Sequence, residues 1–140
     1  MADPPKAPDG STLPHDDPEI LGDHRVIRRV PPDQWIDRGD GTFSVSSGLF
    51  SASSEPNGSM SVDIEQKMVA DGETVETVLA GTSFGAVALN VGKLRELALQ
   101  VGCDPLPENK YHGGVWGRFS PGTRKKIQRA AELLMEPRRQ

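Results

Sequence analysis

Three residues suited to acid–base chemistry recur at intervals of four, namely Asp104, Glu108 and His112. On a helix this spacing places side chains on one face, where two carboxylates and an imidazole could transfer protons or bind a divalent metal. Pro105 and Pro107 argue against a helix, because proline lacks an amide N–H and disrupts helical turns. The alternative is a rigid loop with solvated carboxylates, and we predict no metal and no cofactor.

The only cysteine, Cys103, is a second candidate for chemistry. With His112 it could form a nucleophile and its base. A lone cysteine in an alternating apolar segment is more typical of a small core residue. It also excludes an internal disulfide and favours a cytoplasmic location. No apolar run approaches the roughly 18 residues of a membrane span, so we predict no membrane contact.

Three arginines fall within residues 24–30, a short segment whose valines and isoleucine indicate a strand. Arg25, Arg28 and Arg29 are an unusual load of charge for such a segment. They are typical of an edge strand that discourages aggregation. The alternative is a guanidinium directed into a cleft, where it would bind phosphate or carboxylate.

Beyond this strand come a serine-rich stretch over residues 46–54 and then Glu65. Over residues 25–65 this order resembles compact ADP-ribosyl-transferring or NAD-cleaving enzymes. The resemblance implies a nucleotide-type substrate such as NAD, with Arg25, Arg28 and Glu65 as catalytic candidates, and we add His112. An enzyme of this kind requires Arg25 or Arg28, a serine hydroxyl, and Glu65 or His112 to converge on one concave pocket.

The segment from Gly117 to Thr123 precedes the clearest helix and suggests an anion site. Its glycine spacing resembles a phosphate-binding loop, but the lysine of that motif is missing. Free amides at a helix start, together with nearby cations, bind anions in general. The predicted anion-binding residues are Arg118, Thr123, Arg124 and Lys125. The alternatives are a threonine that only caps its helix and a solvated basic face.

Residues 101–140 carry eight basic and four acidic residues, a net +4 in a chain of net −4. This asymmetry suggests an anionic partner, such as a nucleotide or nucleic-acid phosphate. Tyr111, His112 and Trp116 lie in a glycine-containing strand there and are candidate partner-binding residues, since aromatic side chains often anchor interfaces. The alternative is that these aromatic residues belong to the core.

Alternating and helical apolar patterns define the expected elements. Strands are expected near residues 24–30, 42–46, 84–89, 99–103 and 111–116, and residues 60–70 fit a short strand running into a helix. Helices are expected over 74–80, from Asn90 to about Ala98, and from Ser120 to Pro137. We therefore predict an α+β fold, with a small, mostly antiparallel sheet covered on one face by two or three helices.

The first 22 residues are rich in proline and aspartate and poor in large aliphatic residues. Such a composition predicts a disordered tail, because it buries too little surface to offset the entropy of ordering. Residues 23–140 then form a single domain. The favoured function is a non-enzymatic interaction or accessory module that docks a protein or an anionic, phosphate-bearing partner, and the alternative is the small nucleotide-directed enzyme described above.

Overall fold

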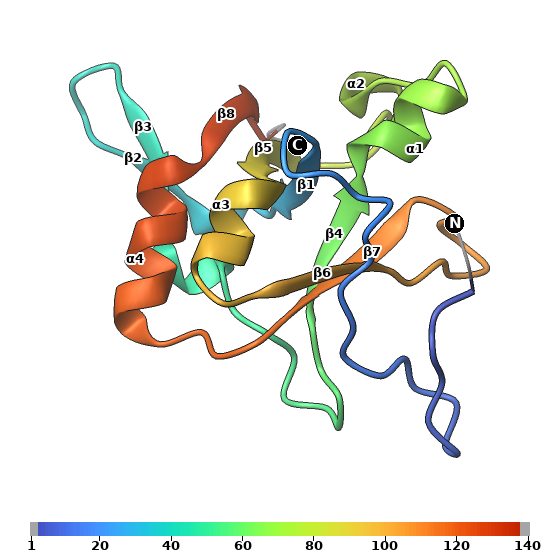
Figure 1. Cartoon of the computed structure of the whole chain (residues 1–140). Coiled ribbons are helices and arrows are strands. Elements are labelled where there is room, and N and C mark those ends of the chain that lie inside the picture. The colour runs from blue at the N-terminus through green and yellow to red at the C-terminus, as the bar shows by residue number, and fades with distance from the viewer. Residues whose placement is uncertain (1–2, 138–140) are drawn as a thin grey trace.

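A six-stranded antiparallel sheet is the centre of the fold, which the computed structural model describes for residues 3–137 (Figure 1). Every neighbouring pair of strands in it is antiparallel. The predicted α+β class with a mostly antiparallel sheet is therefore confirmed. In spatial order the strands are β6 (Gln100–Cys103), β7 (His112–Trp116), β4 (Met60–Ile64), β1 (Arg25–Val30), β5 (Gly85–Asn90) and β8 (Glu132–Met135).

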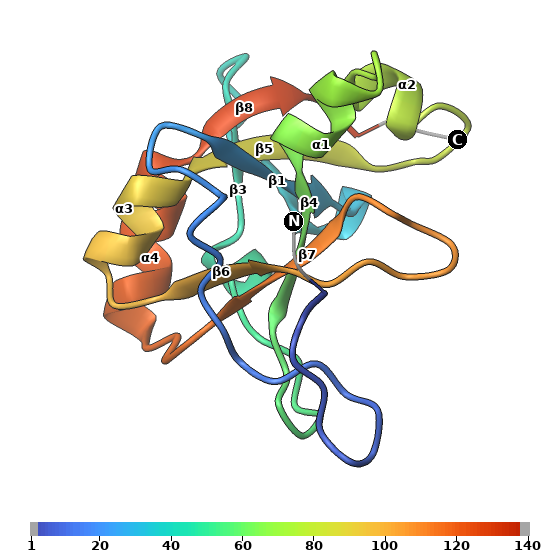
Figure 2. The same ribbon diagram turned by 45° about the vertical axis from the view of Figure 1, so that its right-hand side comes forward.

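Helices pack on both faces of this sheet (Figure 2). On one face, α3 and α4 contribute Leu94 and Ile127 to the larger apolar cluster. On the other, Met68 of α1 and Leu79, which follows α2, belong to a smaller cluster. The helices, which were expected on one face of the sheet, are thus divided between its two faces. Their bounds are α1 Glu65–Ala70, α2 Val75–Val78, α3 Val91–Glu96 and α4 Pro121–Ala130.

The first strand, β1, lies inside the sheet between β4 and β5 and is not the edge strand that its charges suggested. Its apolar residues Val26, Ile27 and Val30 are all buried, and they come from both faces of the strand. The burial of apolar residues on both faces of β1 outweighs the presence of the charged arginines in an inner strand. The long stems of the arginines carry their charged ends away from the core. The expected strand running into a helix at residues 60–70 is confirmed by β4 and α1.

The segment near residues 42–46 forms a strand as expected, but this strand is not part of the six-stranded sheet. Strand β3 (Phe43–Val45) pairs with β2 (Trp35–Asp37) in a separate hairpin. The Asp40–Gly41 turn joins the two strands, and an Asp-Gly pair is typical of hairpin turns. Prolines 31 and 32 lack backbone donors, so the ladder of β1 cannot continue and the chain leaves the sheet. Two short 3-10 turns flank the hairpin, η1 (Pro32–Gln34) and η2 (Ser47–Leu49).

The last helix is shorter than its apolar stripe predicted. α4 ends at Ala130, and Ala131 adopts extended backbone angles (φ −66°, ψ 135°). The following residues form β8, which pairs with β5 and places Leu133 opposite Val87. Pairing along the open edge of β5 gives these residues hydrogen bonds to another strand. A further helical turn would supply hydrogen bonds only within its own segment. Tertiary contacts have therefore overridden the helical period at Leu134.

The N-terminal segment, residues 3–22, runs beside β6 in contrast to the disordered tail that its composition predicted (Figures 1 and 2). The side chain of Ile20 is fully buried. The backbone N–H of Asp17 donates to the carbonyl of Val101 at 2.8 Å, and the carboxylate of Asp16 accepts from the Val101 N–H at 3.0 Å. Because β6 is an edge strand with free backbone groups, a polar segment can bind it with a single large aliphatic anchor.

Candidate functional site

A pocket lined by charged and polar side chains opens where β1 and β4 separate. The two strands pair only at Val26 with Ile64 and at Ile27 with Asp63, whereas β1 and β5 pair along all six residues of β1. Beyond these pairs lies a pocket of about 290 Å³, which we call the β1–β4 pocket. The polar residues that line it are Arg28, Arg29, Ser61, Asp63, Glu108, Asn109 and His112.

Arg28 brings a positive charge into this pocket without a carboxylate partner among residues 3–137. Its Nε and one Nη donate to the carbonyl of Leu49 at 3.1 and 2.9 Å, and its other Nη donates to the carbonyl of Ser61 at 2.8 Å. Burial lowers the pKa of its guanidinium. A half-buried cation held only by neutral carbonyls would be stabilised by an anion in the pocket.

Arg29, in contrast, is neutralised by Asp63. The Asp63 carboxylate is 3% exposed and accepts from Arg29 Nε at 2.9 Å and from its Nη2 at 3.3 Å. The side-chain amide of Asn109 also donates to it, at 2.6 Å. This buried carboxylate is fully engaged, and its charge cancels that of Arg29. Arg28 and the exposed Glu108 are the other two charged residues that line the pocket.

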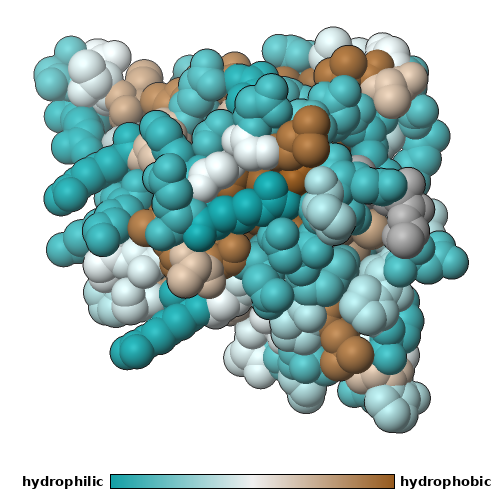
Figure 3. Space-filling model, viewed as in Figure 1, coloured by the Kyte–Doolittle hydropathy of each residue, from teal (hydrophilic) through white to brown (hydrophobic). Residues whose placement is uncertain are grey.

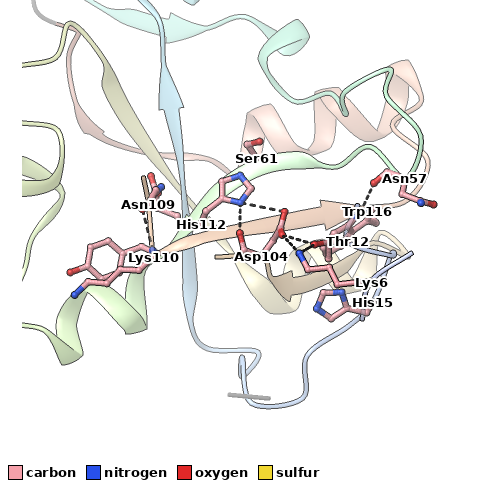
Figure 4. A network of polar contacts seen from close by, with 12 residues as sticks. Lys6, Thr12, His15, Asn57, Ser61, Asp104, Asn109, Lys110, His112 and Trp116 are labelled. Atoms are coloured by element: carbon pink, nitrogen blue, oxygen red, sulfur yellow. Dashed lines mark hydrogen bonds and ion pairs between the residues drawn. The ribbon is translucent and has the colours of Figure 1, made fainter. Parts of the chain in front are cut away.

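His112 is held in one orientation by Asp104 (Figure 4). Its Nδ1 lies 2.8 Å from the Asp104 carbonyl oxygen and 3.5 Å from a carboxylate oxygen of the same residue. Because a carbonyl only accepts, Nδ1 carries the proton, and Nε2 of the neutral ring is the acceptor. The other carboxylate oxygen of Asp104 accepts from Thr12 at 2.6 Å and lies 3.7 Å from Lys6 Nζ.

The candidate trio Asp104, Glu108 and His112 is thus partly brought together by a loop rather than by a helix. Asp104 contacts His112, while Glu108 and His112 both line the β1–β4 pocket. Among residues 3–137 no group of three histidine, cysteine or acidic side chains is arranged to hold a metal ion.

The other two catalytic candidates, Arg25 and Glu65, lie apart from this pocket and bind each other. Arg25 donates to both carboxylate oxygens of Glu65, at 2.9 and 2.6 Å, and to Glu132 at 2.8 Å. The hydrogen bond to Glu65 is the main reason that the pKa of Arg25 is raised. Only Arg28 and His112 of the four candidates therefore share the pocket, together with the serine hydroxyl of Ser61.

The cysteine–histidine pair is not supported as a reactive pair. Cys103 is buried and packs in the larger apolar cluster. Burial, and then a hydrogen bond with Asp17, raise the pKa of its thiol. Since the thiolate is the nucleophile, this environment keeps Cys103 unreactive.

The predicted anion-binding residues at the start of α4 do not line the β1–β4 pocket. Ser120 caps the helix by accepting from the Thr123 amide at 3.2 Å, so this donor is already used. Arg118 and Lys125 are exposed, and Nε of Arg124 is buried without a hydrogen-bond partner among the described residues. The anion site at α4 therefore remains a prediction.

Of the candidate partner-binding residues, Trp116 lies in the core. It is 2% exposed, donates from Nε1 to the Asn57 carbonyl at 3.0 Å, and packs against the ring of His15 at 4.9 Å (Figure 4). Tyr111 is half-buried and donates to Asp71 at 2.9 Å. In this arrangement Trp116 is covered by the N-terminal segment and is not presented to a partner.

Ser61, Asp63 and Asn109 are site residues that sequence reasoning missed. A usable signal was present in β4, where Ser61 and Asp63 alternate with the buried residues Met60, Val62 and Ile64. This alternation places both polar side chains on the opposite face of the sheet. Nothing in the local pattern around Asn109 indicated that it would reach a strand 46 residues away.

In comparisons with known proteins, no family model, no curated protein and no solved structure is significantly similar to this chain. Over residues 3–137, none of the helices is long and apolar enough to cross a membrane. Any functional conclusion therefore rests on the chemistry of the β1–β4 pocket itself.

Proposed function

We propose that the β1–β4 pocket binds a small phosphate-bearing ligand, with Arg28 as its countercharge. The observation that carries this proposal is the half-buried Arg28 guanidinium, which contacts carbonyls but no carboxylate among residues 3–137. A guanidinium has five N–H groups in a planar fork that matches phosphate oxygens. Three of them are used on Leu49 and Ser61, so one N–H on each Nη is free for a ligand.

The size of the pocket also favours a small ligand. Its volume of about 290 Å³ lies at the lower end of the roughly 300–1,000 Å³ range of ligand pockets. His112 and Asn109 line it and add polar groups that could orient a phosphate. We include a cytoplasmic location in this proposal, as the single cysteine favours.

A protein partner has less support than a small anion. The exposed large apolar residues Leu13, Leu21, Ile36, Val69 and Leu133 come from separate segments of the chain. The face seen in Figure 3 is mostly hydrophilic, and its apolar patches are small and separated. Stable protein interfaces usually present a continuous patch with an apolar centre.

A nucleotide-directed enzyme is the second candidate function, and one observation favours it. Arg28, Ser61 and His112 line one pocket, which supports this hypothesis in part, since Ser61 lies outside the serine-rich stretch 46–54. Glu65 does not take part, because it is paired with Arg25 elsewhere. The support therefore concerns Arg28, Ser61 and His112 and not the whole arginine–serine–glutamate order.

Calorimetric titration with pyrophosphate and ADP, at low and high salt, tests the binding proposal. We expect salt-sensitive binding that Arg28→Gln weakens at least tenfold, since charge-assisted hydrogen bonds to phosphate are lost. Arg38→Gln removes the same charge from the exposed β2–β3 turn and is the matched control. Arg28→Lys, which keeps the charge, should bind with intermediate affinity, and circular dichroism checks that each variant folds.

A triple variant, Arg118→Gln, Arg124→Gln and Lys125→Gln, tests the rival site at α4 in the same experiment. Our proposal expects this variant to bind pyrophosphate as the unmodified chain does. Loss of binding in the triple variant with normal binding in Arg28→Gln would transfer the site to α4. No salt-sensitive binding by the unmodified chain would overturn both sites.

A further inference from the structure

We propose that Ser61 and His112 form a nucleophile and general base that hydrolyse acyl groups carried on phosphate, with Asp104 as the positioning residue. This inference rests on the proposed function, because Arg28 would hold the phosphate of the substrate. It adds a reaction to a pocket that would otherwise only bind a phosphate-bearing ligand.

The strand register places Ser61 and His112 on the same face of the sheet. Asp63 lies opposite His112, and Ser61 lies two residues earlier on β4, opposite Gly114. Diagonal neighbours of this kind are within reach of a long or aromatic side chain. Gly114 has no side chain, and the Trp116 ring and the Ser59 hydroxyl fill the space that a Cβ there would occupy.

In Figure 4 His112 lies between Asp104 and Ser61. Figure 4 shows Ser61 on the side of the His112 ring that lies away from Asp104. The Nδ1 proton of His112 is bound to the Asp104 carbonyl at 2.8 Å, which leaves the lone pair of Nε2 for the serine hydroxyl. The Ser61 side chain is exposed and has no hydrogen bond within residues 3–137, so its hydroxyl can rotate without breaking one.

Asp104 supplies a negative charge beside the ring and is itself fixed. Its carboxylate oxygen lies 3.5 Å from His112 Nδ1, where it stabilises the imidazolium that forms when His112 takes a proton. Thr12 donates to the other carboxylate oxygen at 2.6 Å, and the Asp104 amide donates to the His112 carbonyl at 3.0 Å. Asp104 therefore acts through His112 and does not need to touch the substrate.

The reaction proceeds in two balanced steps. Ser61 Oγ forms a bond to the acyl carbon while its proton moves to His112 Nε2, and the bond between that carbon and the phosphate oxygen breaks. The phosphate leaves with the bonding electron pair and takes the proton from His112, while Arg28 stabilises its charge. Water then loses a proton to His112 and attacks the acyl carbon, and Ser61 leaves and recovers that proton. The net change is acyl phosphate plus water to carboxylic acid plus phosphate.

The hydrolysis of acetyl phosphate tests this reaction. It is measured as the loss of acyl groups that react with hydroxylamine. We expect Ser61→Ala and His112→Asn to lower the rate about 100-fold or more, the usual effect of losing a nucleophile or its base. Ser54→Ala and His24→Gln are matched controls, since both lie outside the pocket, and they should keep the rate of the unmodified chain. A fluorophosphonate probe should add one label per chain, at Ser61, by mass spectrometry.

The variant Asp104→Asn keeps the backbone carbonyl and removes only the charge. It should lower kcat for acetyl phosphate and leave KM nearly unchanged, because the imidazolium that forms during the reaction has lost a nearby carboxylate. A merely structural role for Asp104, which would disturb the pocket itself, would raise KM as well.

The outcomes separate this inference from the proposed function. If the unmodified chain binds pyrophosphate but hydrolyses acetyl phosphate no faster than Ser61→Ala does, and Ser61 takes no label, binding stands and catalysis is overturned. If hydrolysis depends on Ser61 and His112 but not on Arg28, catalysis stands and the anion-binding role fails. Ser61→Ala that still binds pyrophosphate while losing hydrolysis is the result we expect.

Discussion

The three arginines of β1 show how differently neighbouring residues of one type can act. Arg25 binds Glu65 and Glu132, Arg29 binds the buried Asp63, and Arg28 contacts only backbone carbonyls. Two of these charges are therefore cancelled within the protein. Arg28 keeps free donors and lines the same pocket as His112, and this difference is the reason that the anion proposal centres on one residue.

Trp116→Ala is expected to lower the free energy of unfolding by about 3–5 kcal/mol, the usual cost of removing a large buried aromatic side chain. The indole is 2% exposed, and its N–H donates to the Asn57 carbonyl. Urea denaturation followed by far-ultraviolet circular dichroism measures this change. Trp116→Phe keeps most of the packing and should cost much less. Unchanged stability in the alanine variant would show that Trp116 is an exposed anchor instead.

Among the elements, β8 is the one whose position depends most on its neighbours. Residues 132–135 continue the helical stripe of α4 in the sequence, yet they pair with β5. Gly85 in β5 permits this close approach, because a Cβ there would lie 2.4 Å from the Met135 carbonyl oxygen.

A matched pair of glycine substitutions tests this packing. Gly85→Ala should lower the free energy of unfolding by about 1–3 kcal/mol, as overpacking against backbone does. Gly122→Ala, at the start of α4, meets no atom within 4 Å and should be neutral or slightly stabilising. Thermal denaturation of both variants measures the difference. Equal stability of the two variants would mean that β8 does not lie against β5.

At the scale of the whole molecule, the N-terminal segment determines whether the β6 edge of the sheet is covered. It contributes the buried Ile20, two hydrogen bonds to Val101, and the His15 ring that packs on Trp116. It also holds Asp104 through Thr12, and so connects the edge of the sheet with the β1–β4 pocket.

Deletion of residues 1–22 should lower the thermal midpoint by at least about 5 °C, since losing a buried isoleucine alone costs about 2–5 kcal/mol. Ile20→Ala should reproduce part of this effect, and Leu13→Ala, at an exposed site, should not. Differential scanning calorimetry provides the measurement. A midpoint that stays the same after deletion would support the disordered tail that composition alone predicts.

The sequence by itself determined the elements whose signal is local. Short apolar segments, alternating in β4 and β6 and continuous in β5, marked the strands β1, β4, β5, β6 and β7. Helical spacing marked α3 and α4, and together these signals predicted the α+β class. Tertiary structure decided which strands pair, that residues 132–135 leave the helix, and that residues 3–22 lie along β6. It also decided the site, because Arg28, Ser61 and His112 line one pocket only when β1, β4 and β7 lie side by side. The physical reason is range: side-chain periodicity is set by neighbours a few residues away, whereas pairing and convergence depend on contacts between segments that the sequence keeps far apart.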